Sequence, residues 1–74
     1  MTMDQLKIAI AAIEPENGEG YFARVYFGPH HIDGALYEPG QGLLRLSVGR
    51  EGTTADSKYA QVKISAITAI ERVE

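Results

Sequence analysis

Two runs rich in β-branched residues constrain the fold of this chain most. Residues 58–64 read Lys-Tyr-Ala-Gln-Val-Lys-Ile and residues 67–73 read Ile-Thr-Ala-Ile-Glu-Arg-Val, with only Ser65 and Ala66 between them. Such runs are typical of β-strands. A hairpin turn needs Gly, Asn or Pro, and none of these separates the two runs. The sequence therefore predicts one strand that bends sharply into the next, as at the corner of a small barrel.

The composition narrows the class of protein. A chain of 74 residues makes one domain, residues 1–74, and the absence of cysteine excludes disulfides and thiolate metal sites. Small secreted domains usually carry disulfides, so a cytoplasmic location is expected. Seven Lys and Arg against ten Asp and Glu give a net charge of −3, which disfavours nucleic-acid binding, although a local basic face can exist in an acidic chain.

The first residues predict a helix. Thr2 and Gln5 have the spacing of a capping box, and Pro15 ends the pattern because the residue before proline avoids helical backbone. One stripe of apolar side chains follows at helical spacing: Met3, Leu6, Ile10 and Ile13. Residues 6–10 also alternate as a strand would, but the cap and three alanines favour the helix. This apolar segment is too short to span a bilayer and lacks the basic start of a signal peptide.

The rest of the chain alternates strand patterns with turn residues. Five strands are expected, over residues 21–27, 31–37, 43–48, 58–64 and 67–73. Gly34, in the middle of the second strand, marks a bend or the close approach of another backbone. The predicted fold is mainly β, with an N-terminal α-helix followed by five antiparallel strands that close into a small barrel and so hide their edges.

This layout resembles the Sm-like family, a subset of the SH3-type barrels, over about residues 23–73. Two segments carry the resemblance: Ile32-Asp33-Gly34-Ala35-Leu36, which is similar to the family's second strand, and Ala66-Ile67-Thr68-Ala69-Ile70, which is similar to its junction between strands four and five. The resemblance implies a small SH3-type barrel behind an N-terminal helix. It also implies rings in which strand four of one subunit pairs with strand five of the next.

The chain departs from the family at the residues that contact RNA. The bacterial RNA chaperone of the family has Lys-His at the junction of strands four and five, where this chain has Ile64-Ser65. Gln41 matches the polar residue of the family's RNA loop, but Gly42 replaces the aromatic residue beside it. Aromatic stacking supplies much of the affinity for single-stranded RNA, so the resemblance implies the fold more strongly than it implies RNA binding.

Candidate binding residues lie on the outer strand faces and at the junction. For RNA or another partner they are Gln41, Lys63, Ser65, Arg24 and Arg45, with Lys58 as a further cation. The alternative is an ordinary solvated face whose arginine stems cover apolar surface. Candidate residues of an oligomer interface lie in strands four and five, which contain no edge-protecting proline: Tyr59, Val62, Ile67 and Ile70.

No residue pattern predicts catalysis or a metal site. His30 and His31 stand near Asp33, but neighbouring strand residues point to opposite faces, so one ion would rarely meet both rings. Ser47 lacks the surroundings of a nucleophile elbow, and the Gly-rich segment 49–54 precedes a strand, whereas a phosphate cradle precedes a helix. We therefore expect no catalytic residue, no metal and no cofactor.

Together these features predict a non-enzymatic, Sm-like binding or regulatory protein that acts through self-association and a macromolecular partner. The acidic composition and the missing RNA-contact residues favour a protein partner over RNA. A single-stranded RNA chaperone is one alternative. A sensor that binds a small ligand in a pocket between subunits is another. No membrane partner is expected.

Overall fold

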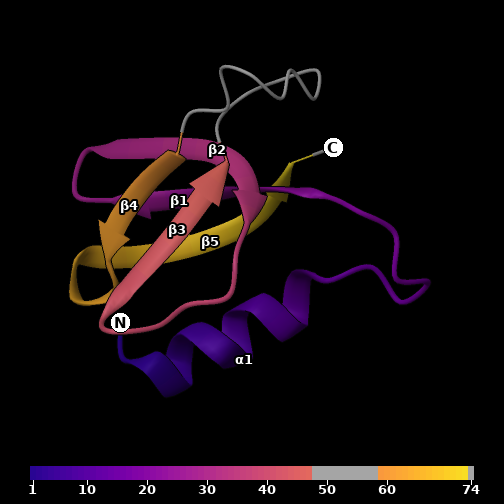
Figure 1. Cartoon of the computed structure of the whole chain (residues 1–74), viewed down its shortest axis with the longest axis horizontal. Coiled ribbons are helices and arrows are strands. Elements are labelled where there is room, and N and C mark those ends of the chain that lie inside the picture. Colours follow the sequence, from indigo (N-terminus) through magenta and orange to yellow (C-terminus); the bar gives the residue numbers. More distant parts are fainter. Residues whose placement is uncertain (48–58, 74) are drawn as a thin grey trace.

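The computed structural model describes residues 1–47 and 59–73 and places one helix beside a five-stranded sheet (Figure 1). The elements are α1 (Met3–Ile13), β1 (Phe22–Phe27), β2 (His30–Leu36), β3 (Leu43–Ser47), β4 (Tyr59–Lys63), the 3-10 helix η1 (Ile64–Ala66) and β5 (Ile67–Val73). The predicted helix and five strands are confirmed, with shifts of single residues at some ends. Val48 (the predicted end of the third strand), the predicted loop 49–57 and Lys58 lie outside the described residues.

A capping box stabilises the N-terminus of α1. The Thr2 hydroxyl accepts from the Gln5 backbone N–H at 3.1 Å, and the Gln5 side chain accepts from the Thr2 N–H at 2.8 Å, which completes the capping box. Leu6 is fully buried whereas Ile8 is 71% exposed, so the segment is a helix and the alternative strand reading of residues 6–10 is wrong. Among the described residues, no helix has the length and apolar character needed to cross a membrane.

The sheet is antiparallel and open. Its strand order is β4-β3-β2-β1-β5, so β4 and β5 are the two edges, and they do not pair with each other within the described residues. The predicted corner between these strands is confirmed as η1, in which the Ile67 N–H donates to the Ile64 carbonyl. The predicted closure into a barrel is not confirmed. A single 3-10 turn brings the end of β4 near the start of β5 but does not reverse the chain. The two strands therefore do not form a hydrogen-bonded pair over residues 59–73.

Strand β2 bends at Gly34 because it serves two partners. His30–Gly34 pairs with β1, whereas Ala35 and Leu36 pair with β3. A Cβ on Gly34 would lie 2.4 Å from the Ser47 backbone oxygen, a distance that side-chain carbons do not tolerate. The predicted role of Gly34, a bend with close approach of another backbone, is confirmed.

The core is built from the inward faces of the sheet and one face of α1. Its buried residues are Leu6, Ala23, Val25, Leu44, Leu46, Val62, Ile64 and Ile67. The predicted alternation of inward and outward side chains is confirmed in β1, β3 and β4. Within the described part of the chain no polar or charged residue is buried, so the chemistry of these residues lies at the surface.

Replacing Gly34 with Ala is expected to lower the free energy of unfolding by about 1–3 kcal/mol, because the new methyl group must push away the backbone of β3. Gly20→Ala is the matched control. No atom lies within 4 Å of a Cβ placed there, so stability should stay unchanged or rise by up to about 1 kcal/mol. Urea unfolding followed by circular dichroism measures both variants. Equal unfolding midpoints would contradict the close approach of β2 and β3.

Candidate functional site

Three of the predicted binding residues lie together at one end of the sheet. The Ile64 N–H donates to the Gly42 carbonyl at 2.9 Å, which holds the turn before β3 against the end of β4. Gln41 stands in this turn with a left-handed φ of 55°, and Lys63 and Ser65 are exposed on the neighbouring chain segment. The turn and the β4–β5 junction therefore form one continuous polar surface.

The outer side of β3 and β4 adds a cation and a pair of aromatic rings to this surface. Arg45 is exposed and shares a hollow of about 280 Å³ with Gln41 and Glu38. The rings of Tyr37 and Tyr59 lie 5.4 Å apart, tilted by 51°, and the Tyr37 N–H donates to the Arg45 carbonyl at 2.9 Å. The sequence reasoning did not select Tyr37. The sequence feature that could have identified Tyr37 is its position two residues after Ala35, which puts it on the same outward face at the end of β2.

We call this surface the β3–β4 face and define it by Tyr37 and the outward residues Leu43, Arg45, Ser47, Tyr59, Gln61 and Lys63. None of these residues is acidic, so the face carries two positive charges in a chain whose net charge is −3, and Glu38 borders it at the hollow beside Arg45. A hydrogen bond between the Tyr59 and Tyr37 side chains raises the pKa of Tyr59, and the positive charge of Arg45 opposes this rise. Cations beside aromatic rings suit anionic, planar ligands.

Arg24 lies elsewhere, on β1, and its charge is already balanced. Its Nε and Nη2 donate to the two Asp33 carboxylate oxygens at 2.7 and 2.9 Å, and its Nη1 lies 3.7 Å from Glu71. The Tyr26 hydroxyl donates to the same Glu71 carboxylate at 2.6 Å. The bond to Asp33 raises the pKa of Arg24, and the bond to Glu71 raises the pKa of Tyr26. This network joins β5, β1 and β2, so Arg24 is not grouped with the other candidate residues.

The predicted oligomer residues divide into exposed and buried ones. Tyr59 is 56% exposed, whereas Val62 and Ile67 are 5% and 2% exposed and pack in the core. Ile70 is half-buried against the same core. The side chains of Val62 and Ile67 therefore face inward, and these two positions can serve an interface only through their backbone. The outer backbone edges of β4 and β5 have no partner strand among the described residues.

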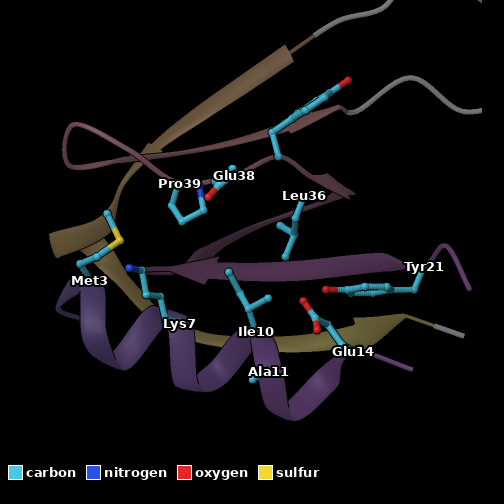
Figure 2. A pocket seen from close by; sticks show the side chains of 10 residues that line it. Met3, Lys7, Ile10, Ala11, Glu14, Tyr21, Leu36, Glu38 and Pro39 are labelled. Atoms are coloured by element: carbon cyan, nitrogen blue, oxygen red, sulfur yellow. The ribbon is translucent and has the colours of Figure 1, made fainter. Parts of the chain in front are cut away.

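A groove that the sequence did not suggest runs along α1 (Figure 2). Its volume is about 510 Å³. One wall is a single face of the helix. The other wall consists of Tyr21, Leu36 and the segment after β2. The lining residues are Met3, Lys7, Ile10, Ala11, Glu14, Tyr21, Leu36, Tyr37, Glu38 and Pro39. We call it the helix groove. Partial burial, assisted by the nearby Glu14 carboxylate, raises the pKa of the Tyr21 phenol.

The histidine pair is split between two aromatic neighbours. The His30 ring lies 5.9 Å from the Phe27 ring, and the His31 ring lies 5.7 Å from the Tyr26 ring. Over residues 1–47 and 59–73, no three His, Asp or Glu side chains gather as metal ligands would. The candidate site consists of three surface features: the β3–β4 face, the edges of β4 and β5, and the helix groove.

Comparison with protein-family models, with curated proteins and with solved structures finds no match to this chain. The function is therefore inferred from the surfaces described above.

The raised pKa of Tyr59 predicts a pH dependence of stability. Because its folded-state pKa lies above the ordinary value of 10.0, the neutral phenol stabilises the fold fully below pH 10, and this contribution is lost as pH rises through the folded-state pKa. The unfolding temperature of the natural chain should fall above about pH 10. The unfolding temperature of the Tyr59→Phe variant should fall less steeply, because residue 59 then has no phenol to ionise. Thermal unfolding between about pH 8 and pH 11 measures both slopes. Identical slopes would contradict the tyrosine pair.

Proposed function

We propose that this chain is a non-enzymatic, Sm-like binding module that self-associates through its strand edges and acts on a partner protein. The observation that carries the proposal is the pair of unprotected edges. Among the described residues no strand pairs with the outer sides of β4 and β5, so each presents a row of backbone N–H and C=O groups, and neither strand contains proline. Pairing β4 of one subunit with β5 of the next would satisfy both rows, and this head-to-tail arrangement forms a ring if the rotation closes.

The arrangement of elements supports the Sm-like, small-barrel type. A helix precedes five antiparallel strands, a glycine bends β2 between two partners, and η1 joins β4 to β5 at the corner. The open side of the sheet between β4 and β5 is the side that a neighbouring subunit would occupy. In this proposal the barrel type and the self-association have one cause, the curvature that brings the two edges toward the same corner.

Charge and exposed apolar surface support a protein as the partner. The chain has a net charge of −3, and Arg24 is neutralised by Asp33 and Glu71. Large apolar side chains stand at the surface, with Phe22 47% and Tyr37 44% exposed. Contiguous apolar surface rimmed by polar residues is typical of protein contacts.

Single-stranded RNA is the second candidate partner, and the β3–β4 face favours it. Arg45 and Lys63 lie there next to the Tyr37–Tyr59 ring pair. Glu38 lines the same hollow as Arg45, but among the described residues the two form no ion pair. Aromatic rings stack bases and cations pair with phosphates, so this combination suits a single strand.

A charge on the β5 edge should break the self-association. Ala69 is exposed on β5, and Ala69→Lys places a charge where the neighbouring strand would pair. Ala12→Lys makes the same substitution on the exposed part of α1 and is the matched control. Light scattering behind a sizing column should give a multiple of 8.1 kDa for the natural chain and for Ala12→Lys, and a smaller particle for Ala69→Lys. A natural chain that stays at 8.1 kDa at about 100 μM would refute self-association.

Anisotropy titrations with U-rich and A-rich RNA test the second candidate. If the β3–β4 face binds RNA, Lys63→Gln weakens binding and reduces the slope of log affinity against log salt by about 0.7, the contribution of one phosphate contact on a single strand. Lys7→Gln removes the same charge from the helix groove and should leave the slope unchanged. Absence of binding even at low salt would eliminate RNA and leave the protein partner.

A further inference from the structure

The helix groove continues into a second hollow. Tyr21 and Leu36 line both the helix groove and an adjoining hollow of about 520 Å³, whose other lining residues are Glu19, Gly20, Phe22 and Ala35. We call the two together the extended groove. Ile10 and Leu36 form the floor of the extended groove. Both side chains are half-buried and pack against the core, so the floor is apolar and is held in place by the core. α1 has 11 residues, so the part along the helix is roughly 16 Å long.

The charges of the extended groove are unbalanced. Its lining holds three carboxylates, those of Glu14, Glu19 and Glu38, against the single ammonium of Lys7, which leaves a net charge of −2. In residues 1–47 and 59–73 none of these four side chains takes part in an ion pair. Glu14 also lines a neighbouring hollow with Arg72, which donates to the carbonyl of Ile13 at 3.4 Å, and Glu38 also lines a hollow with Arg45. The carboxylates of the groove are therefore available to a cation from outside.

Aromatic rings stand beside these carboxylates. Tyr21 lines both parts of the extended groove, and Phe22 lines the hollow that continues the helix groove, whereas the ring of Tyr37 packs against Tyr59. The negative faces of such rings attract guanidinium and ammonium groups, and the rings also bury apolar surface. A groove with an apolar floor, aromatic rings and unpaired carboxylates complements a ligand that is both apolar and positively charged.

We propose that the extended groove docks a basic, extended segment of a partner protein, in which Arg or Lys alternates with apolar side chains. Alternate residues of an extended segment point to opposite sides, so the apolar ones enter the floor while the basic ones reach the carboxylates on the rim. About five residues cover the part along α1, at roughly 3.3 Å per residue. This inference rests on the proposed protein partner and names its chemistry. The β3–β4 face shares only Tyr37 with the extended groove and has the opposite charge.

The test uses a fluorescein-labelled hexapeptide of alternating Arg and Leu and the same peptide with Glu in place of Arg. Fluorescence anisotropy should show saturable binding of the Arg peptide and none of the Glu peptide. Glu14→Gln combined with Glu38→Gln should weaken the affinity about three- to tenfold, and Lys7→Gln should tighten it about two- to fivefold. Glu16→Gln removes the same charge two residues from Glu14 but does not line the groove, and should change the affinity less than about twofold.

Two results would overturn the docking proposal. One is the absence of saturable binding of the Arg peptide up to about 1 mM, which is the weak end of specific association. The other is an equal effect of Glu16→Gln and the groove variants, which would mean that net charge alone attracts the peptide. Circular dichroism shows whether each variant is folded. Light scattering on the same samples separates the docking proposal from the self-association proposal. If the chain is an oligomer but does not bind the peptide, the docking proposal is refuted and the self-association proposal is not.

Discussion

The curvature of this protein follows from one short connection. β4 and β5 are at opposite edges of a five-stranded sheet, yet only Ile64–Ala66 joins them. In a flat sheet the edges would stand roughly 19 Å apart, four spacings of about 4.8 Å. The four steps from Lys63 to Ile67 span at most about 14 Å even when fully extended. The sheet must therefore curl until the end of β4 meets the start of β5, as Figure 1 shows.

The curl places demands on the strands between the edges. β2 meets them by pairing with β1 before Gly34 and with β3 after it, and the missing side chain lets the β3 backbone come close. The concave side then holds the apolar core, closed at one end by Leu6 of α1. Among the described residues no charged side chain is buried, so the charges lie at the surface. The β3–β4 face and the extended groove thus acquire opposite signs on different parts of one small surface.

The features that depend on residues close together in the sequence could be predicted from the sequence. The Thr2–Gln5 cap, the alternation of Leu44 and Leu46 with Arg45, and the corner at Ser65-Ala66 each follow from local chemistry. Sequence reasoning failed where distant segments decide the outcome. Whether the sheet closes depends on the gap between β4 and β5, and the pairing of Arg24 with Asp33 and Glu71 depends on the register of three strands. The helix groove likewise depends on where α1 sits against the segment after β2.

The division of β2 between two partners makes the sheet a structure of two leaves. β5, β1 and the first part of β2 form one leaf, tied together by the Arg24 network, and β3 and β4 form the other. Within the described residues, backbone pairing between the leaves is limited to Ala35 and Leu36, extended by the Tyr37 N–H, and η1 joins the leaves at the corner. Backbone opening in such a protein begins at the thinnest seam. The amide protons that join β3 to β2 should therefore exchange with solvent before those between β1 and β5, with the leaf of β3 and β4 detaching as a unit.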